Sequence, residues 1–315
     1  YYIEQGLGKK FKPAAFLFAS FGMIGCLPQF QSNQVAEILE ATYQIPRMVS
    51  GPGMLLLVGV VILGGLSRIA RVASRLVPVM CGIYLLSALY IALINLDRVP
   101  TVFLQILQDA FTGSAAIGGA AGIGFVTVVQ TGIKRAAFSN EAGIGTAPMA
   151  HGAARTREPV REGLVAMMGP VVDTLLVCSL TGFIILSAGD WRDTEGIQGV
   201  ALTATAFEAA MGEFGVALLT VIVFMFGIST MFGYSYYGKK CFAYLFGAER
   251  ARFYEWFYLA SVWIAAIWSA RVVINLADTA FALMAFPNML AVLLLSPRVM
   301  REVRSYFGES RHLRG

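Results

Sequence analysis

Two glutamines stand in the polar second half of an otherwise apolar run, 13–39, where an amide group needs a partner. Gln31 and Gln34 lie three residues apart, so a helix would place both side chains on one face. An amide in an apolar environment must hydrogen-bond within the protein or to a ligand. We therefore consider two interpretations for Gln31, a hydrogen bond to a small polar ligand and a contact between helices. For Gln34 the helix contact is favoured.

Two adjacent hydroxyl groups, those of Ser229 and Thr230, lie in the middle of another apolar run. Hydroxyl oxygens and freed backbone carbonyls are hard ligands, and they suit a small hard cation such as sodium. Serine and threonine in a helix also donate to the backbone carbonyl one turn earlier. The sequence leaves both interpretations open.

Asp173 is the ionisable residue whose burial in an apolar run would cost the most free energy. An ionisable group in such a place is by default a functional candidate. Its carboxyl group can relay protons, pair with a cation, or be protonated and hydrogen-bonded to a neighbouring helix. The third role is favoured, because no basic residue stands in the middle of any apolar run.

The polar stretch 139–151 contains Ser139, Glu141 and His151, which are residue types found in hydrolases. A hydrolase needs a nucleophile beside a base that a third group orients. No nucleophile elbow or metal pair occurs here, and neither His151 nor His312 has partners at metal-binding spacing. The stretch predicts a short capped helix and turns at a cytoplasmic gate.

Residues 100–132 are the element expected to position a site. An amphipathic helix (102–111) and an apolar helix (120–130) flank the glycine-rich sequence TGSAAIGG (112–119). Glycine is a poor helix former and permits unusual backbone dihedrals, so we predict one membrane crossing that is broken in the middle. Freed amides at such a break can face an anionic group, and freed carbonyls a cation. The alternative is a face of small residues that packs against another helix.

The composition indicates a protein with several membrane spans. Of the 315 residues, 57% are hydrophobic and only 14% are charged, unlike a soluble domain. The net charge of +5 comes from clusters between apolar runs, which argues against a nucleic-acid-binding groove. The four cysteines are scattered without a CxxC motif, so neither a disulfide framework nor a zinc site is expected.

The distribution of basic residues predicts the topology. If the loops alternate in side, 20 of the 24 Lys and Arg residues fall on one side, which should be the cytoplasm. That side holds a basic loop (67–75), a polar loop (134–163) and the C-terminal tail (297–315). A short surface helix is expected at 200–211. The eight predicted spans are 13–39, 48–66, 76–96, 100–132, 164–186, 214–237, 253–270 and 272–296.

The sequence SNEAGIGTAPMAHGAA (139–154) resembles the signature of the alanine or glycine:cation symporter family, also called sodium:alanine symporters. YYIEQGLG (1–8), NLAD (275–278) and LMAFPN (283–288) extend the resemblance along the whole chain. The resemblance implies an all-α polytopic membrane protein of the leucine-transporter type, with two inverted five-helix repeats. The eight spans would be core helices three to ten of a single transporter domain (1–315). The chain would then lack the first core helices.

The resemblance also implies a function, which is sodium-coupled symport of a small neutral amino acid, such as alanine or glycine, by alternating access. The protein would be a multi-pass protein of the inner (plasma) membrane, with sodium as coupling ion, the lipid bilayer as surroundings and no nucleic-acid partner. It would not be an enzyme. Sodium is assigned to Ser229 and Thr230. The substrate is assigned to Gln31, Phe111, Thr112, Gly113, Ser114, Ile117, Gly118, Gly119, Thr230 and Tyr234.

Departures from the family pattern leave the substrate open. Tyr234 replaces a tryptophan, Arg271 stands where an acidic residue is usual, and Phe281 and Ala282 replace an Asn-Gly pair. These changes reshape the expected pocket. The rival functions are a transporter coupled to protons through Asp173 and a passive channel or scaffold. An intramembrane enzyme is the least favoured alternative.

Overall fold

The computed structural model describes residues 1–111, 123–141, 143–187 and 199–312, which form helices and no strand. The first half contains α1 (Tyr2–Leu7), η1 (Lys9–Phe11), α2 (Lys12–Gly25), α3 (Gln29–Tyr43), α4 (Arg47–Ile62), α5 (Gly65–Ile94), η2 (Leu96–Arg98), α6 (Val99–Phe111) and α8 (Ile123–Asn140). The second half contains α9 (Ala147–His151), α10 (Pro159–Pro170), the π-helical η3 (Val171–Cys178), α11 (Ser179–Ser187), α12 (Val200–Met211), α13 (Glu213–Phe246), η4 (Ala248–Arg250), α14 (Ala251–Ile267) and α15 (Ala270–His312).

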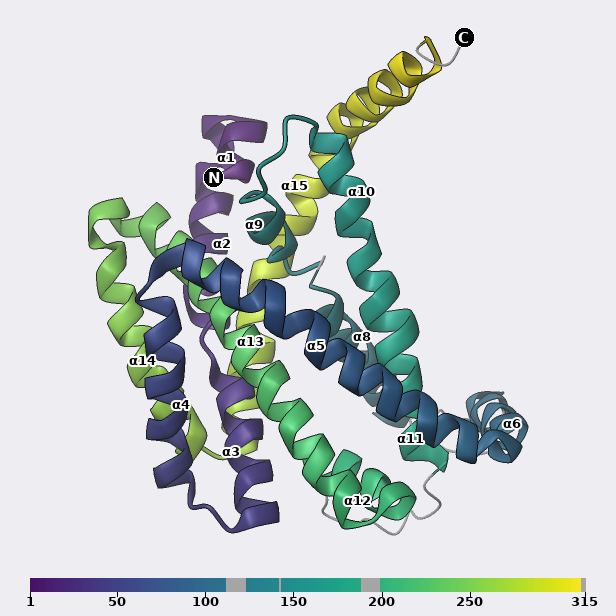
Figure 1. Ribbon diagram of the computed structural model, residues 1–315. Coiled ribbons are helices and arrows are strands. Elements are labelled where there is room, and N and C mark those ends of the chain that lie inside the picture. Colours follow the sequence, from purple (N-terminus) through teal and green to yellow (C-terminus); the bar gives the residue numbers. More distant parts are fainter. Residues whose placement is uncertain (112–122, 142, 188–198, 313–315) are drawn as a thin grey trace.

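Helix α13 is the centre of the arrangement. It crosses the middle of the bundle in Figure 1 and packs against α2, α3, α5, α12 and α14. Because it has neighbours on several sides, its sequence is apolar over most of its circumference, as expected for an interior helix. The polar residues that α13 does carry therefore lie where they need partners from other helices.

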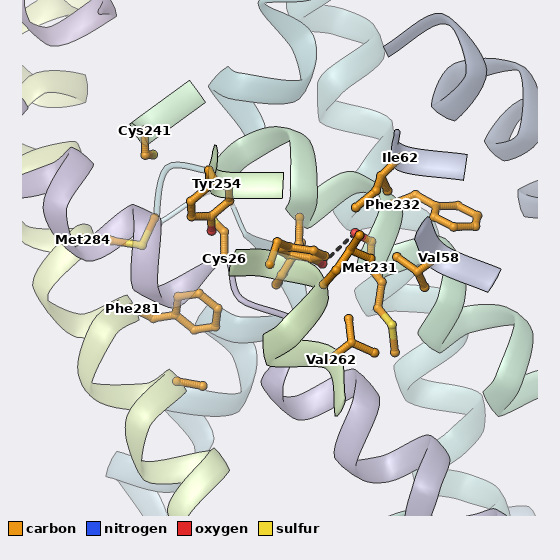
Figure 2. Close-up of a cluster of buried hydrophobic side chains, with 14 of the residues drawn as sticks. Cys26, Val58, Ile62, Met231, Phe232, Cys241, Tyr254, Val262, Phe281 and Met284 are labelled. Atoms are coloured by element: carbon orange, nitrogen blue, oxygen red, sulfur yellow. Dashed lines mark hydrogen bonds between the residues drawn. The ribbon is translucent and has the colours of Figure 1, made fainter. Parts of the chain in front are cut away.

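Two hydrophobic clusters meet on α13. Figure 2 draws the larger one, which includes Val58 of α4, Phe232 of α13, Tyr254 of α14 and Phe281 of α15. The smaller cluster lies towards the start of α13 and joins it to α3, α5, α11 and α12. Its large side chains are Ile38, Tyr84, Ile91, Ile184, Phe207, Leu219 and Ile222.

The helices are long and apolar enough for an all-α membrane protein. Among the described residues, five helical segments have the length and hydropathy to cross a bilayer. Many large apolar side chains of α5, η3 and α15 are exposed, as they would be against lipid. The five segments are Lys9–Tyr43, Leu66–Ile94, Pro159–Ser187, Glu213–Phe246 and Ala270–Gly308.

The first expected span is interrupted, which the hydropathy pattern does not reveal. Helix α2 ends at Gly25 and α3 begins at Gln29. Pro28 between them has no backbone N–H to continue the helix. The side-chain Nε2 of Gln29 donates at 3.0 Å to the carbonyl of Ile24, which also accepts the backbone N–H of Leu27 at 3.1 Å.

The basic stretch 67–75 and most of the tail after residue 297 are helical, whereas the sequence analysis treats them as a loop and a tail. They form the beginning of α5 and the end of α15. Arginine, serine and alanine are compatible with helix, so charge alone does not end one. Pro297 is likewise accommodated within α15.

The predicted broken crossing at 100–132 is described only at its two ends, as α6 and the first part of α8. The connection at 112–122 lies outside the described residues. Helix α6 is attached to α11, because Arg98 just before it donates to the carbonyl of Ser187. The segment 134–163 contains the end of α8, all of α9 and the start of α10. In α8, Arg135 binds Asp278 of α15 through Nη2 at 2.5 and 2.7 Å.

The contact between α13 and α14 gives a test of the packing. A Cβ added to Gly238 would lie 2.0 Å from the hydroxyl oxygen of Tyr254, and this hydroxyl donates to the carbonyl of Met23 at 2.7 Å. We expect Gly238→Ala to destabilise the protein by about 1–3 kcal/mol, because the interior cannot expand to hold the methyl group. The measurement is the melting temperature of purified protein in detergent.

Gly53→Ala is the matched control, since a Cβ at Gly53 in α4 has no neighbour within 4 Å. Its melting temperature should equal or exceed that of the wild type, because alanine favours helix. Equal melting temperatures for the two variants would contradict the close approach of α13 and α14.

Candidate functional site

A cavity of about 490 Å³ lies between α3, α5, α8, η3, α12 and α13. This volume is in the range of pockets that hold small molecules. Three of the residues predicted for the substrate, Gln31, Thr230 and Tyr234, line it. The side chain of Phe111 and the whole of 112–119 lie outside the described residues, so their predicted contacts stay predictions.

The two glutamines have different surroundings. Gln34 is occupied, because its Oε1 accepts from the backbone N–H of Val200 at 3.1 Å and its Nε2 donates to Glu37 at 3.0 Å. Gln31 is only 7% exposed, and its buried Oε1 has no hydrogen-bond partner among the described residues. A buried amide oxygen without a partner costs free energy. The contact between helices therefore suits Gln34, whereas Gln31 keeps the capacity to bind a ligand.

The hydroxyl groups of Ser229 and Thr230, in α13, both bind the backbone of that helix. Ser229 and Thr230 each donate to the carbonyl of Phe226 at 2.9 Å, and Ser229 also lies 3.3 Å from the sulfur of Met80. Thr230 borders the cavity, whereas Ser229 is not among its lining residues. A hydroxyl that donates to a carbonyl keeps its oxygen lone pairs, so Thr230 can still offer an oxygen to a ligand.

An interruption of the helical structure, called the break below, lies at the cavity wall between α8 and α9. Helix α8 stops because Glu141 adopts a left-handed conformation with φ of 59°, which is uncommon for a residue with a side chain. Its backbone N–H still donates to the carbonyl of Ala137 at 3.2 Å. Gly145 then turns the chain with φ of 93°, and α9 begins at Ala147.

Side chains from within the break and from α13 hold its conformation. The Glu141 carboxylate accepts from Thr146 Oγ1 at 2.8 Å through one oxygen and from the Tyr234 hydroxyl at 3.0 Å through the other. Hydrogen bonds to a carboxylate are stronger than those between neutral groups. Glu141 therefore connects the turn to the central helix beside the cavity.

Helices α2 and α15 enclose the break from the opposite side. A Cβ at Gly145 would come within 2.6 Å of Phe18 and 2.8 Å of Asn288, so only glycine fits there. The Nδ2 of Asn288 donates to the carbonyl of Gly143 at 2.9 Å. These contacts satisfy backbone groups that an interrupted helix leaves free.

An aromatic wall closes one side of the cavity. The ring of Phe138 in α8 lines the cavity and lies between Phe30 of α3 and Phe281 of α15, with ring centroids 5.2 and 5.3 Å away. Such separations are typical of favourable aromatic pairs. The sequence analysis does not single out Phe138, and it considers Glu141 only as part of a disfavoured hydrolase group and not as a residue of the cavity. The sequence pattern that could have located both residues is the helix end FSNEAGIG (138–145), in which two glycines follow the polar residues Ser-Asn-Glu.

Asp173 also lines the cavity, from the π-helical segment η3. Ser139 of α8 donates to its Oδ2, and Thr174 lies 3.4 Å from the same oxygen. The predicted hydrogen bond to a neighbouring helix is therefore present, with Asp173 as the acceptor, whereas the predicted protonation of its carboxyl group stays a prediction. Segments of π-helix occur frequently at functional sites.

The bond between Glu141 and Tyr234 can be measured with a double-mutant cycle. Tyr234→Phe and Glu141→Ala each remove one partner, and we expect their destabilisations to be non-additive by about 1.5–3 kcal/mol, as for a hydrogen bond to a charged group. The measurement is the free energy of unfolding of the four proteins. A parallel cycle with Tyr236→Phe should give additive effects, and additivity in both cycles would contradict the contact.

Comparison with known proteins assigns the chain to a family. The model of the sodium:alanine symporter family matches residues 1–314. An uncharacterised transporter of Haemophilus influenzae is 39% identical over 98% of this chain and 68% of its own length. The sodium/alanine symporter AgcS of Methanococcus maripaludis is 35% identical over 96% and 66%, respectively.

A third relative, the putative sodium/proton-dependent alanine carrier protein YrbD of Bacillus subtilis, is 32% identical over 97% of this chain and 66% of its own length. The chain thus spans about two thirds of the length of these curated relatives. The family consists of transporters and not of enzymes. The chain belongs to the sodium:alanine symporter family.

Proposed function

We propose that this protein is a sodium-coupled symporter of a small neutral amino acid, of the alanine or glycine type, in the cytoplasmic membrane. The observation that carries the proposal is the convergence of Gln31, Thr230 and Tyr234 on one cavity in a chain of this family. The alternating-access mechanism and the leucine-transporter-type inverted repeat belong to the same proposal, as does a cytoplasmic C-terminus. A relative named as a sodium/alanine symporter supports it.

The substrate would bind in the cavity with its polar groups against Gln31 and Thr230. Tyr234 and Phe138 border the same space and would limit the size of the substrate side chain. The substrate carboxylate would meet backbone amides of 113–119 together with the other residues assigned there. Sodium would bind at the hydroxyl groups of Ser229 and Thr230.

A proton-coupled transporter is the second candidate. It is favoured by the position of Asp173 at the cavity wall and by the name of the relative YrbD, which includes both sodium and protons. A carboxyl group inside a membrane protein is a common proton carrier.

Uptake into vesicles tests the function and separates these candidates. The full-length protein is reconstituted, and accumulation of labelled alanine is measured with a sodium gradient or a proton gradient imposed alone. We expect uphill accumulation driven by sodium. Accumulation driven only by protons would replace the proposal with the second candidate, and an absence of uphill accumulation would indicate a passive channel or scaffold.

Gln31→Ala tests the cavity as the substrate site. We expect substrate affinity to fall roughly two- to thirty-fold, corresponding to loss of about 0.5–2 kcal/mol. The measurement is equilibrium binding of labelled alanine to purified protein. Gln29→Ala is the matched control, because Gln29 is equally buried but does not line the cavity. Equal affinity in wild type and Gln31→Ala would assign Gln31 to helix packing.

A further inference from the structure

The charge of the cavity differs from what one sodium ion and one neutral amino acid can balance. Two carboxylates, those of Glu141 and Asp173, line the cavity. No lysine, arginine or histidine is among its lining residues in the described part of the chain. A neutral amino acid carries both an ammonium and a carboxylate group, so it adds no net charge. With both carboxyl groups ionised, one bound sodium ion would leave one carboxylate without a counter-ion among the described lining residues, which is unfavourable in a membrane protein.

The two carboxylates are not equally satisfied by protein donors. Glu141 receives a hydroxyl group at each of its oxygens, from Thr146 and from Tyr234. Asp173 receives Ser139, Thr174 and the Cys178 thiol at Oδ2, while its Oδ1 accepts no hydrogen bond from any residue that the structure describes. Asp173 thus retains an oxygen that can bind a cation.

The surroundings of Asp173 favour positive charge. Ser139 belongs to the last turn of α8, which ends at Asn140. The C-terminal end of a helix carries a partial negative charge from its unpaired carbonyls and attracts cations. The oxygen atoms of Ser139 and Thr174 lie beside the carboxylate and are hard ligands of the kind that small cations prefer.

Gln31 is an independent sign that the cavity takes a polar occupant. Its side chain, on α3, is more than nine-tenths buried and lines the same cavity, and its Oε1 has no protein partner among the described residues. A binding cavity with unsatisfied polar groups is consistent with a polar or charged ligand.

We propose that Asp173 binds a second monovalent metal cation, with the chemistry of sodium, between η3 and the end of α8. This site is additional to the one at Ser229 and Thr230, and the inference rests on the proposed function. With both cations and a neutral amino acid bound, the two carboxylates of the cavity are balanced. The Ser139 hydroxyl then serves as a cation ligand as well as a link between the helices.

Equilibrium binding of radioactive sodium to the purified full-length protein, in the presence of alanine, tests this site. Wild type should bind two equivalents. Asp173→Asn and Thr230→Val should each lose one equivalent, because each removes an oxygen ligand from a different site. Asp97→Asn is the matched control on the exposed η2 segment and should bind as wild type does.

Ser139→Ala provides a second variant that keeps the carboxylate. It should lower the affinity for one of the two sodium equivalents by roughly tenfold, because one oxygen ligand is lost. Melting temperatures of all variants identify any that fail to fold. If Asp173→Asn does not fold, unchanged affinity of both sodium equivalents in folded Ser139→Ala overturns the second site.

The remaining outcomes separate this inference from the proposed function. If wild type binds one equivalent of sodium, and Thr230→Val loses it while Asp173→Asn retains it, the second site is overturned and sodium symport is kept. No sodium binding in wild type would overturn sodium symport itself. In the last outcome, wild type and Asp173→Asn each bind one equivalent of sodium, and proton uptake on substrate binding is seen only in wild type. This result would make Asp173 a proton carrier and overturn the second metal site.

Discussion

The hydrogen bonds of the Glu141 carboxylate hold the site together. An interrupted helix inside a membrane protein exposes backbone groups that must find partners within the protein. Glu141 supplies the connection, since it ends α8, receives Thr146 from the turn and receives Tyr234 from α13. Without this connection, the end of α8 would lose its hydrogen bond to α13 beside the cavity.

The cavity lies where the two hydrophobic clusters of the bundle meet. Its lining includes Val35 and Tyr234 of the larger cluster and Tyr84, Leu219 and Ile222 of the smaller one. Because α13 belongs to both clusters, it forms a common wall, and the other walls come from helices that contact it on different sides. The site therefore depends on the packing of the whole bundle and not on one loop.

The sequence predicted the helical membrane class and three residues of the cavity. Apolar runs are sufficient to locate long helices, and Gln31, Thr230 and Tyr234 follow from polar residues in those runs together with the family resemblance. The sequence predicted turns and a short helix at 139–151, as α9 confirms, but it did not predict that this break lines the cavity. Helix α8 ends at a glutamate in a left-handed conformation whose carboxylate binds Thr146 of the turn and Tyr234 of α13, and hydropathy contains no information on those partners.

The prediction of a broken membrane crossing was placed at residues 112–119 because a cluster of glycines is the strongest local signal for a broken helix. At the described break only Gly145 requires its lack of a side chain, owing to the contacts with Phe18 and Asn288. The interruption between α2 and α3 was missed for a similar reason. A single proline inside an apolar run is common, and its effect depends on a capping side chain such as Gln29.

The break between α8 and α9 has a consequence for the rates of motion in this protein. Bending a continuous helix breaks several backbone hydrogen bonds, whereas a turn with few such bonds can change its dihedral angles with a smaller loss. Moving α9 relative to α8 would have to break the backbone hydrogen bond from Gly145 to Glu141 and the side-chain hydrogen bonds of Glu141 and Asn288. Collective motions of this kind occur in microseconds to milliseconds, much faster than the unfolding of a helix within a packed bundle.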